Sequence, residues 1–189
     1  MTTKLLLTLA AVCAASAAFA ASASGQTTGP YEIHPVSSTF CLDVRGGETA
    51  TANGTLVQQW GCWGGTNQEW TLTPAFISGS YEIHPVSAPG SCLDVRGGGT
   101  AEANGTPVQI WGCWGGGNQE WYLNPSANSP SAWTLIRPES AITVNACLDI
   151  AGGGMNNGTP AQIWTCWAPS QQQFYLTLTA TGAAMGAHK

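Results

Sequence analysis

The chain contains Val57-Gln-Gln-Trp-Gly-Cys-Trp-Gly-Gly-Thr-Asn-Gln-Glu-Trp70, and about 51 residues later it contains Val108-Gln-Ile-Trp-Gly-Cys-Trp-Gly-Gly-Gly-Asn-Gln-Glu-Trp121. Upstream of each stretch stands the same box, Cys41-Leu-Asp-Val-Arg-Gly-Gly47 in the first case and Cys92-Leu-Asp-Val-Arg-Gly-Gly98 in the second. Self-similarity at this period predicts that the chain is built from copies of one supersecondary unit.

A third copy is weaker. It has the box Cys147-Leu-Asp-Ile-Ala-Gly-Gly153, then Ala161-Gln-Ile-Trp-Thr-Cys-Trp167, and it ends in Gln171-Gln-Gln-Phe-Tyr-Leu176. Every copy divides into short β-type runs separated by Gly, Asn and Pro, and no run shows helical periodicity. One copy cannot cover its own apolar face, so three copies of four strands predict an all-β, closed, three-fold unit with a shared core.

An Asn-Gly pair lies between two β-type runs in every copy, at Asn53-Gly54, Asn104-Gly105 and Asn157-Gly158. Both central residues of a tight hairpin take positive φ, which Asn and Gly tolerate well. We therefore expect a tight hairpin at each pair.

The cysteines follow the repeat. The chain has seven, and Cys13 lies in an N-terminal segment that we expect to be removed. The spacing within each copy predicts three local disulfides in an oxidising compartment, Cys41–Cys62, Cys92–Cys113 and Cys147–Cys166.

The N-terminal segment resembles an export signal, with Lys4 followed by an apolar run and small residues at a cleavage site. We expect a secreted, extracellular product with no membrane insertion. The predicted organisation is a signal peptide at 1–23, one domain at 29–179 with repeats near 29–78, 79–128 and 129–179, and a flexible tail at 180–189.

The composition limits the classes of ligand. Charged residues make up 8% of the chain, the net charge is −5, and there are nine tryptophans. The absence of a basic cluster excludes nucleic acid as an expected partner. Neutral polar groups and aromatic rings are left to carry recognition, which suits an uncharged ligand.

Taken together, the box, the cysteine spacing and the terminal motifs Gln68-Glu69-Trp70 and Gln119-Glu120-Trp121 resemble the ricin B-type lectin family. The resemblance covers essentially the whole mature chain. It implies a β-trefoil with pseudo-three-fold symmetry and up to one shallow sugar site per repeat. It also implies galactose or N-acetylgalactosamine as ligand, with xylan-type or other polysaccharides second, and glycans or cell-surface glycoconjugates as partners.

A sugar site needs an aromatic ring, a carboxylate acceptor and amides close together. Each repeat supplies an Asp as acceptor of hydroxyl protons, a Trp as stacking platform, an amide as hydroxyl partner and supporting glutamines. In the third copy Gln171 replaces the Asn, Ala151 the Arg and Phe174 the core Trp, so we expect a weak or altered site there. The candidates are Asp43, Gln58, Trp60, Asn67 and Gln68; Asp94, Gln109, Trp111, Asn118 and Gln119; and Asp149, Gln162, Trp164 and Gln171.

Other repeated residues have more than one interpretation. Trp63, Trp114 and Trp167 directly follow a cysteine and either cover the disulfide, which the sequence favours, or extend the sugar site. Arg45 and Arg96 either brace the nearby carboxylate or are structural. A three-fold metal site is not expected, because the third copy has an arginine where the others have histidine.

Two other classes of function are less consistent with the sequence. Glycoside hydrolysis needs two carboxylates in a cleft, and the best pair, Asp43 with Glu48, is lost in the second copy, where Gly99 replaces the Glu. We therefore expect no enzyme and no cofactor. A trefoil that binds proteins, such as a protease inhibitor, uses a single loop, whereas the candidate set recurs in every repeat.

Overall fold

A computed structural model describes residues 28–125 and 134–179. The expected signal peptide and tail lie outside the described residues. No helix within the described part is long and apolar enough to cross a membrane. The strands are β1 (Thr28–Pro35), β2 (Phe40–Val44), β3 (Thr55–Gly61), β4 (Glu69–Pro74), β5 (Ser80–Pro85), β6 (Ser91–Val95), β7 (Thr106–Gly112), β8 (Trp121–Pro125), β9 (Thr134–Pro138), β10 (Ala146–Ile150), β11 (Ala161–Thr165) and β12 (Phe174–Leu178).

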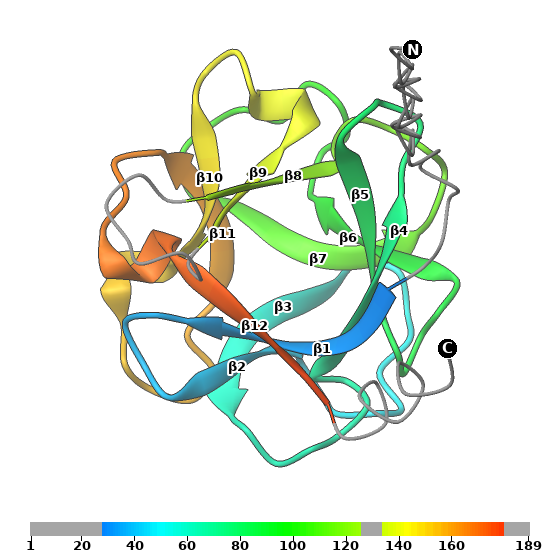
Figure 1. Cartoon of the computed structure of the whole chain (residues 1–189), viewed down its shortest axis with the longest axis vertical. Helices are drawn as coiled ribbons and strands as arrows, with labels where there is room; N and C mark the ends of the chain where they lie inside the picture. The colour runs from blue at the N-terminus through cyan, green and yellow to red at the C-terminus, as the bar shows by residue number, and fades with distance from the viewer. Residues whose placement is uncertain (1–27, 126–133, 180–189) are drawn as a thin grey trace, which may run out of the picture.

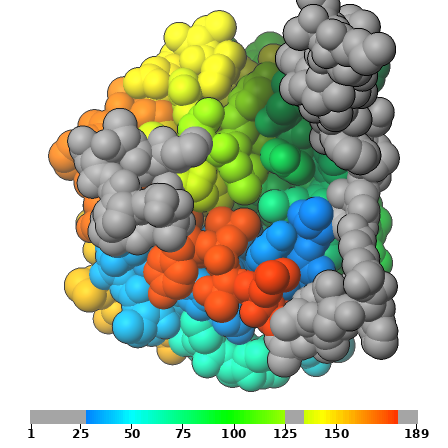
Figure 2. Space-filling model, viewed as in Figure 1, coloured from blue at the N-terminus to red at the C-terminus, as the bar shows by residue number. Residues whose placement is uncertain are grey.

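Six of these strands close a barrel in the order β1-β12-β9-β8-β5-β4 (Figure 1). The first and last strands pair antiparallel, and they lie side by side on the surface in blue and red (Figure 2). The other six strands form three hairpins, β2–β3, β6–β7 and β10–β11, which meet through β7. The predicted all-β β-trefoil of three repeats is confirmed.

The three repeats share one core. Each contributes the same four apolar positions from its first, second and fourth strands, and all twelve side chains are fully buried. A single repeat cannot fold alone, because its apolar side chains are covered by those of the other two repeats. The positions are Ile33, Leu42, Val44 and Trp70; Ile83, Leu93, Val95 and Trp121; and Ile136, Leu148, Ile150 and Phe174.

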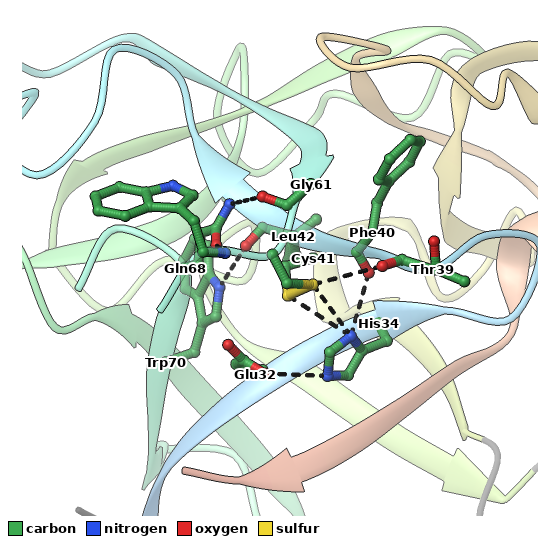
Figure 3. A network of polar contacts seen from close by, with 11 residues as sticks. Glu32, His34, Thr39, Phe40, Cys41, Leu42, Gly61, Gln68 and Trp70 are labelled. Carbon is green, nitrogen blue, oxygen red and sulfur yellow. Dashed lines mark hydrogen bonds and ion pairs between the residues drawn. A yellow bond between two sulfur atoms is a disulfide. The ribbon is translucent and has the colours of Figure 1, made fainter. Parts of the chain in front are cut away.

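The three predicted disulfides are present, one in each repeat. Each joins the second strand of a repeat to the residue directly after its third strand. In the chain-entropy model, closing such a loop stabilises the fold by about 3 kcal/mol. In the first repeat the His34 ring lies beside the Cys41–Cys62 bridge, where Nδ1 is 3.2 Å from the Phe40 carbonyl oxygen (Figure 3). The disulfide closes the hairpin, and His34 of β1 links the barrel to it.

The expectation of a tight Asn-Gly hairpin is wrong. β2 ends at Val44 and β3 begins at Thr55, so a ten-residue loop connects the strands instead of a two-residue turn. The Asn-Gly pair instead forms a turn at the end of this loop, where the Thr55 N–H donates to the Ala52 carbonyl and Gly54 has φ of 88°. The left-handed conformation accounts for the glycine, but the turn serves a contact between repeats that is described below.

Three short 3₁₀ helices occur in the third repeat, at η1 (Glu139–Ala141), η2 (Ala151–Gly153) and η3 (Ser170–Gln172). The last two flank the position of the candidate site in this repeat. The departure from the first two repeats is therefore concentrated where the sequence also diverges.

Candidate functional site

The centre of the site in the first repeat is the carboxylate of Asp43. The antiparallel register of β2 and β3 places Asp43 opposite Gln58, and the Gln58 Nε2 donates to Asp43 Oδ1 at 2.9 Å. Oδ2 accepts from Asn67 Nδ2 at 2.8 Å and from Gln68 Nε2 at 3.0 Å. Three amides from two segments, β3 and the stretch before β4, thus hold one carboxylate in a single orientation.

The second repeat reproduces this arrangement. Asp94 Oδ1 accepts from Gln109 at 2.8 Å, and Oδ2 accepts from Asn118 at 2.7 Å and from Gln119 at 3.0 Å. The same residues in the same register therefore build the same cradle twice.

Burial changes the acidity of these groups. Asp43 and Asp94 are each 3% exposed. Loss of hydration raises the pKa of both carboxyls above the ordinary value, and the amide hydrogen bonds offset part of that rise. An ionised carboxylate has about four acceptor positions, of which the amides occupy three. A position remains for a hydroxyl proton from a ligand.

An exposed tryptophan lies beside each carboxylate. Trp60 is 41% exposed, whereas Trp70, in the terminal motif, is fully buried and its Nε1 donates to the Leu42 carbonyl oxygen at 3.0 Å (Figure 3). The two tryptophans therefore have separate positions, one on the surface and one in the core. Trp111 and Trp121 divide in the same way.

Three pockets follow the repeats, and we name them site 1, site 2 and site 3. Their volumes are about 520, 480 and 350 Å³. Of the predicted candidates, the structure brings Asp43, Gln58, Trp60 and Asn67 together in site 1; Asp94, Gln109 and Trp111 in site 2; and Asp149, Gln162, Trp164 and Gln171 in site 3.

The remaining candidates lie behind the pockets. Gln68 and Gln119 are fully buried. The Nε2 of each donates to the carboxylate and to a backbone carbonyl, and the Oε1 accepts from the backbone N–H of Trp63 or Trp114. Asn118 holds Asp94 but is not part of the pocket wall. These side chains orient the acceptor.

One acceptor in each of the first two cradles has no partner. Asn67 and Asn118 are each 1% exposed, and the Oδ1 of each lacks a hydrogen bond. A buried polar atom without a partner costs about 1–3 kcal/mol. Asn67 also forms part of the wall of site 1.

An arginine and a neighbouring repeat complete the first two sites. The sequence offered the arginine as a brace of the carboxylate, but it did not reveal the part of the neighbouring repeat. Arg45 lines site 1, and its Nε donates to Gln58 Oε1 at 2.8 Å, which turns the Gln58 amide toward Asp43. Gly158 of the third repeat also lines site 1. Asn157 Oδ1 accepts from the Gly61 N–H at 2.8 Å and fixes this turn against the end of β3.

The same brace runs around the molecule. Asn53 of the first repeat accepts from Gly112 in the second, and Asn104 of the second accepts from Thr165 in the third. Each Asn-Gly turn therefore supports the pocket of the next repeat. The repeated Asn-Gly pairs were the sequence signal for these contacts.

Site 3 is altered. Asp149 accepts from Gln162 at 2.9 Å, and Gln172 occupies the role that Gln68 has in site 1. Gln171 lines the pocket and lies near Gly153. Ala151 stands where Arg45 braces Gln58, so the Gln162 amide lacks that support. A smaller pocket with a less constrained cradle results.

Two clusters of potential metal ligands occur in the described ranges, one at His34, Cys41 and Cys62 and one at Glu82, His84, Cys92 and Cys113. The cysteines in both are joined as disulfides. Their sulfurs are therefore not thiolates, which are the metal-binding form of cysteine.

Comparisons with known proteins agree with this architecture. The chain matches ThreeFoil, a designed three-fold symmetric protein, with 23% identity, a TM-score of 0.70, and 79% of this chain and 98% of that chain covered. It matches a ricin B-like lectin from Macrolepiota procera, solved with lactose, with 23% identity, a TM-score of 0.65 and coverages of 82% and 97%. An exo-β-1,3-galactanase from Clostridium thermocellum matches with 22% identity and a TM-score of 0.70 over 80% of this chain, but only 30% of the galactanase.

At these identities the solved structures show the fold alone. The family comparison goes further, because the ricin-type β-trefoil lectin domain matches residues 29–173, which is most of the chain. The chain belongs to the ricin-type β-trefoil lectin family.

Proposed function

We propose that this protein is a secreted, non-catalytic lectin that binds galactose-type or related glycans through sites 1 and 2, with a weaker site 3. The carbohydrate-binding role follows from the family. The choice of galactose or N-acetylgalactosamine is carried by resemblance, and xylan-type polysaccharide is the second candidate.

One observation carries the proposal. A carboxylate held by amides lies beside an exposed indole, and the pair occurs in every repeat. A sugar presents C–H groups on one face and hydroxyls at its edge, so the indole meets the face while the carboxylate accepts hydroxyl protons. A single shallow site of this kind binds at about −4 kcal/mol, which is the millimolar range.

The position of Glu48 argues against hydrolysis at site 1. Glu48 Oε1 accepts from the backbone N–H and the hydroxyl of Thr66, at 2.8 and 3.0 Å. It is exposed and does not line the pocket. Among the described residues, Asp43 is the carboxylate of site 1, whereas glycoside hydrolysis uses a pair.

A glycan array tests the proposal. We expect the mature, disulfide-intact chain to bind glycans that end in galactose or N-acetylgalactosamine, or failing these xylan-type chains, because both present the hydroxyls and apolar face described above. A chain that binds no glycan but inhibits a protease would contradict the lectin proposal and support the protein-binding trefoil.

Binding is expected to weaken on acidification. The pKa values of Asp43 and Asp94 are raised by burial, so these groups lose the charged acceptor at a higher pH than an ordinary aspartate. Protonation of these two carboxyls has the opposite effect on folding. A carboxyl whose pKa is higher in the folded than in the unfolded chain adds stability to the fold as the pH falls through the folded-state pKa toward the unfolded-state pKa. Calorimetric titrations and thermal melts should be run as the pH is lowered through these raised pKa values. The affinity for the glycan should fall, while the contribution of these two groups to the stability of the fold should increase. Affinity independent of pH would contradict the role of the carboxylates.

A further inference from the structure

Each site has a second exposed tryptophan. Trp63, Trp114 and Trp167 are 56%, 60% and 68% exposed and line sites 1, 2 and 3. Their exposure favours the site-extending interpretation over the covering of a disulfide. Tryptophan is highly buried on average, and indoles at the same place in three repeats are not scattered surface residues.

The second indole packs against a glycine in the first two repeats. A Cβ added to Gly65 would lie 2.2 Å from Trp63 Cζ2, and one added to Gly116 would lie 2.1 Å from Trp114 Cη2. The indole therefore fills the space that a side chain would take. The backbone N–H of Trp63 also donates to Gln68 Oε1 at 2.9 Å. Both the ring and the backbone of Trp63 therefore have a contact within the protein.

Both indoles of site 1 line the same pocket as the Asp43 carboxylate. Trp60 lies beside the turn at Gly158, where an added Cβ would be 3.7 Å from Trp60 Cζ3. Trp63 packs over Gly65, whose added Cβ would be 2.7 Å from Asn67 Oδ1, so Trp63 is next to the amide that holds Oδ2. One carboxylate is thus flanked by two platforms.

We propose that sites 1 and 2 each bind two adjacent sugar units of an oligosaccharide, one on Trp60 or Trp111 and the next on Trp63 or Trp114. This inference rests on the proposed lectin function and adds the length of the ligand. Volumes of about 520 and 480 Å³ fall in the range of pockets that enclose drug-sized ligands. A disaccharide is of that size, and a single hexose has about half as many atoms.

Site 3 lacks the glycine against which the second indole packs in sites 1 and 2. Pro169 stands at the position of Gly65 and Gly116, so the third repeat has a side chain where the first two have a glycine against which the indole packs. Trp167 is accordingly more exposed, and the pocket is smaller, at about 350 Å³. The two-unit site is therefore confined to the first two repeats.

Calorimetric titration with matched sugars tests the inference. The probes are galactose against lactose and xylose against xylobiose, and the measured quantity is the ratio of disaccharide to monosaccharide affinity. We expect about 5- to 10-fold in favour of the disaccharide, from one added aromatic contact. The variant Trp63→Ala/Trp114→Ala should bring the ratio close to one. Gly65→Ala/Gly116→Ala, which displaces the indoles without removing them, should lower it as well.

The control is Phe76→Ala, which removes an aromatic side chain that is 95% exposed and lies outside the pockets; the ratio should stay at the wild-type value. A wild-type ratio of one for a monosaccharide that binds would overturn the inference and leave the lectin function standing. A ratio that persists in the double tryptophan variant would also overturn it. No binding of either sugar pair would count against the inference and the proposed function together.

Discussion

The variant Asp43→Asn/Asp94→Asn is expected to lower the affinity for the preferred glycan by about 100-fold, near the upper end of the cost of losing a charged hydrogen-bond acceptor. The ionised carboxylate is the charged acceptor of sites 1 and 2, and hydrogen bonds to charged groups contribute about 1.5–3 kcal/mol each. The amide that replaces it also turns a donor toward donors that are already in place, such as Gln58 Nε2. Calorimetry on the variant and the parent measures the loss.

A charge-matched control separates this effect from a change of net charge. Glu82→Gln/Glu102→Gln removes the same two charges at residues that line none of the three sites, and its affinity should equal that of the parent. Thermal melts show whether both variants are folded. If the aspartate variant is folded and binds as tightly as the parent, the carboxylates are not the acceptors.

Trp70→Ala is expected to destabilise the fold by about 3–5 kcal/mol, the usual cost of truncating a large buried aromatic side chain. Trp70 is fully buried, and its Nε1 donates to the Leu42 carbonyl oxygen. The variant loses both the packing in the shared core and this hydrogen bond. Urea unfolding followed by circular dichroism measures the free energy of unfolding.

The molecule supplies its own comparison for this position. Phe174 fills the equivalent place in the third repeat and is also fully buried, so Trp70→Phe should cost much less than Trp70→Ala. Trp63→Ala, at an exposed indole, should change the stability by no more than about 0.5 kcal/mol. Equal stabilities for Trp70→Ala and Trp63→Ala would show that the core assignment is mistaken.

The strands and the disulfides could be predicted because their signals are local and repeated. The box at Cys41 and its copies fall on β2, β6 and β10, and each cysteine pair lies within one repeat. The surface position of Trp60 and the core position of Trp70 could also be predicted, since the terminal motif already supplies the core tryptophan.

The Asn-Gly pairs marked a repeated turn, but the partner of each turn in the next repeat could not be predicted. Asn157 and Gly158 are remote from Gly61 in sequence but support site 1, and only the closure of the three-fold unit brings them together. The ten-residue loop before β3 was missed for a related reason, because an Asn-Gly pair signals a turn without saying how far the strands extend on either side.

The position of Trp63 depends on the lack of a side chain at Gly65. The indole lies where a Cβ on Gly65 would be, and a glycine pair in a loop is ordinarily interpreted as flexibility or turn geometry. The sequence showed that Trp63 follows a cysteine. Only the three-dimensional arrangement shows that the glycine leaves room for the ring.

The most direct test of sugar binding at the repeated carboxylates is a nuclear magnetic resonance titration of the indole N–H signals with lactose. The account predicts that the signals of Trp60 and Trp111 shift progressively with lactose, whereas those of Trp70 and Trp121, whose Nε1 atoms donate to Leu42 and Leu93 inside the core, stay in place. Saturable binding that leaves the signals of Trp60 and Trp111 unmoved would place the ligand elsewhere and contradict the account.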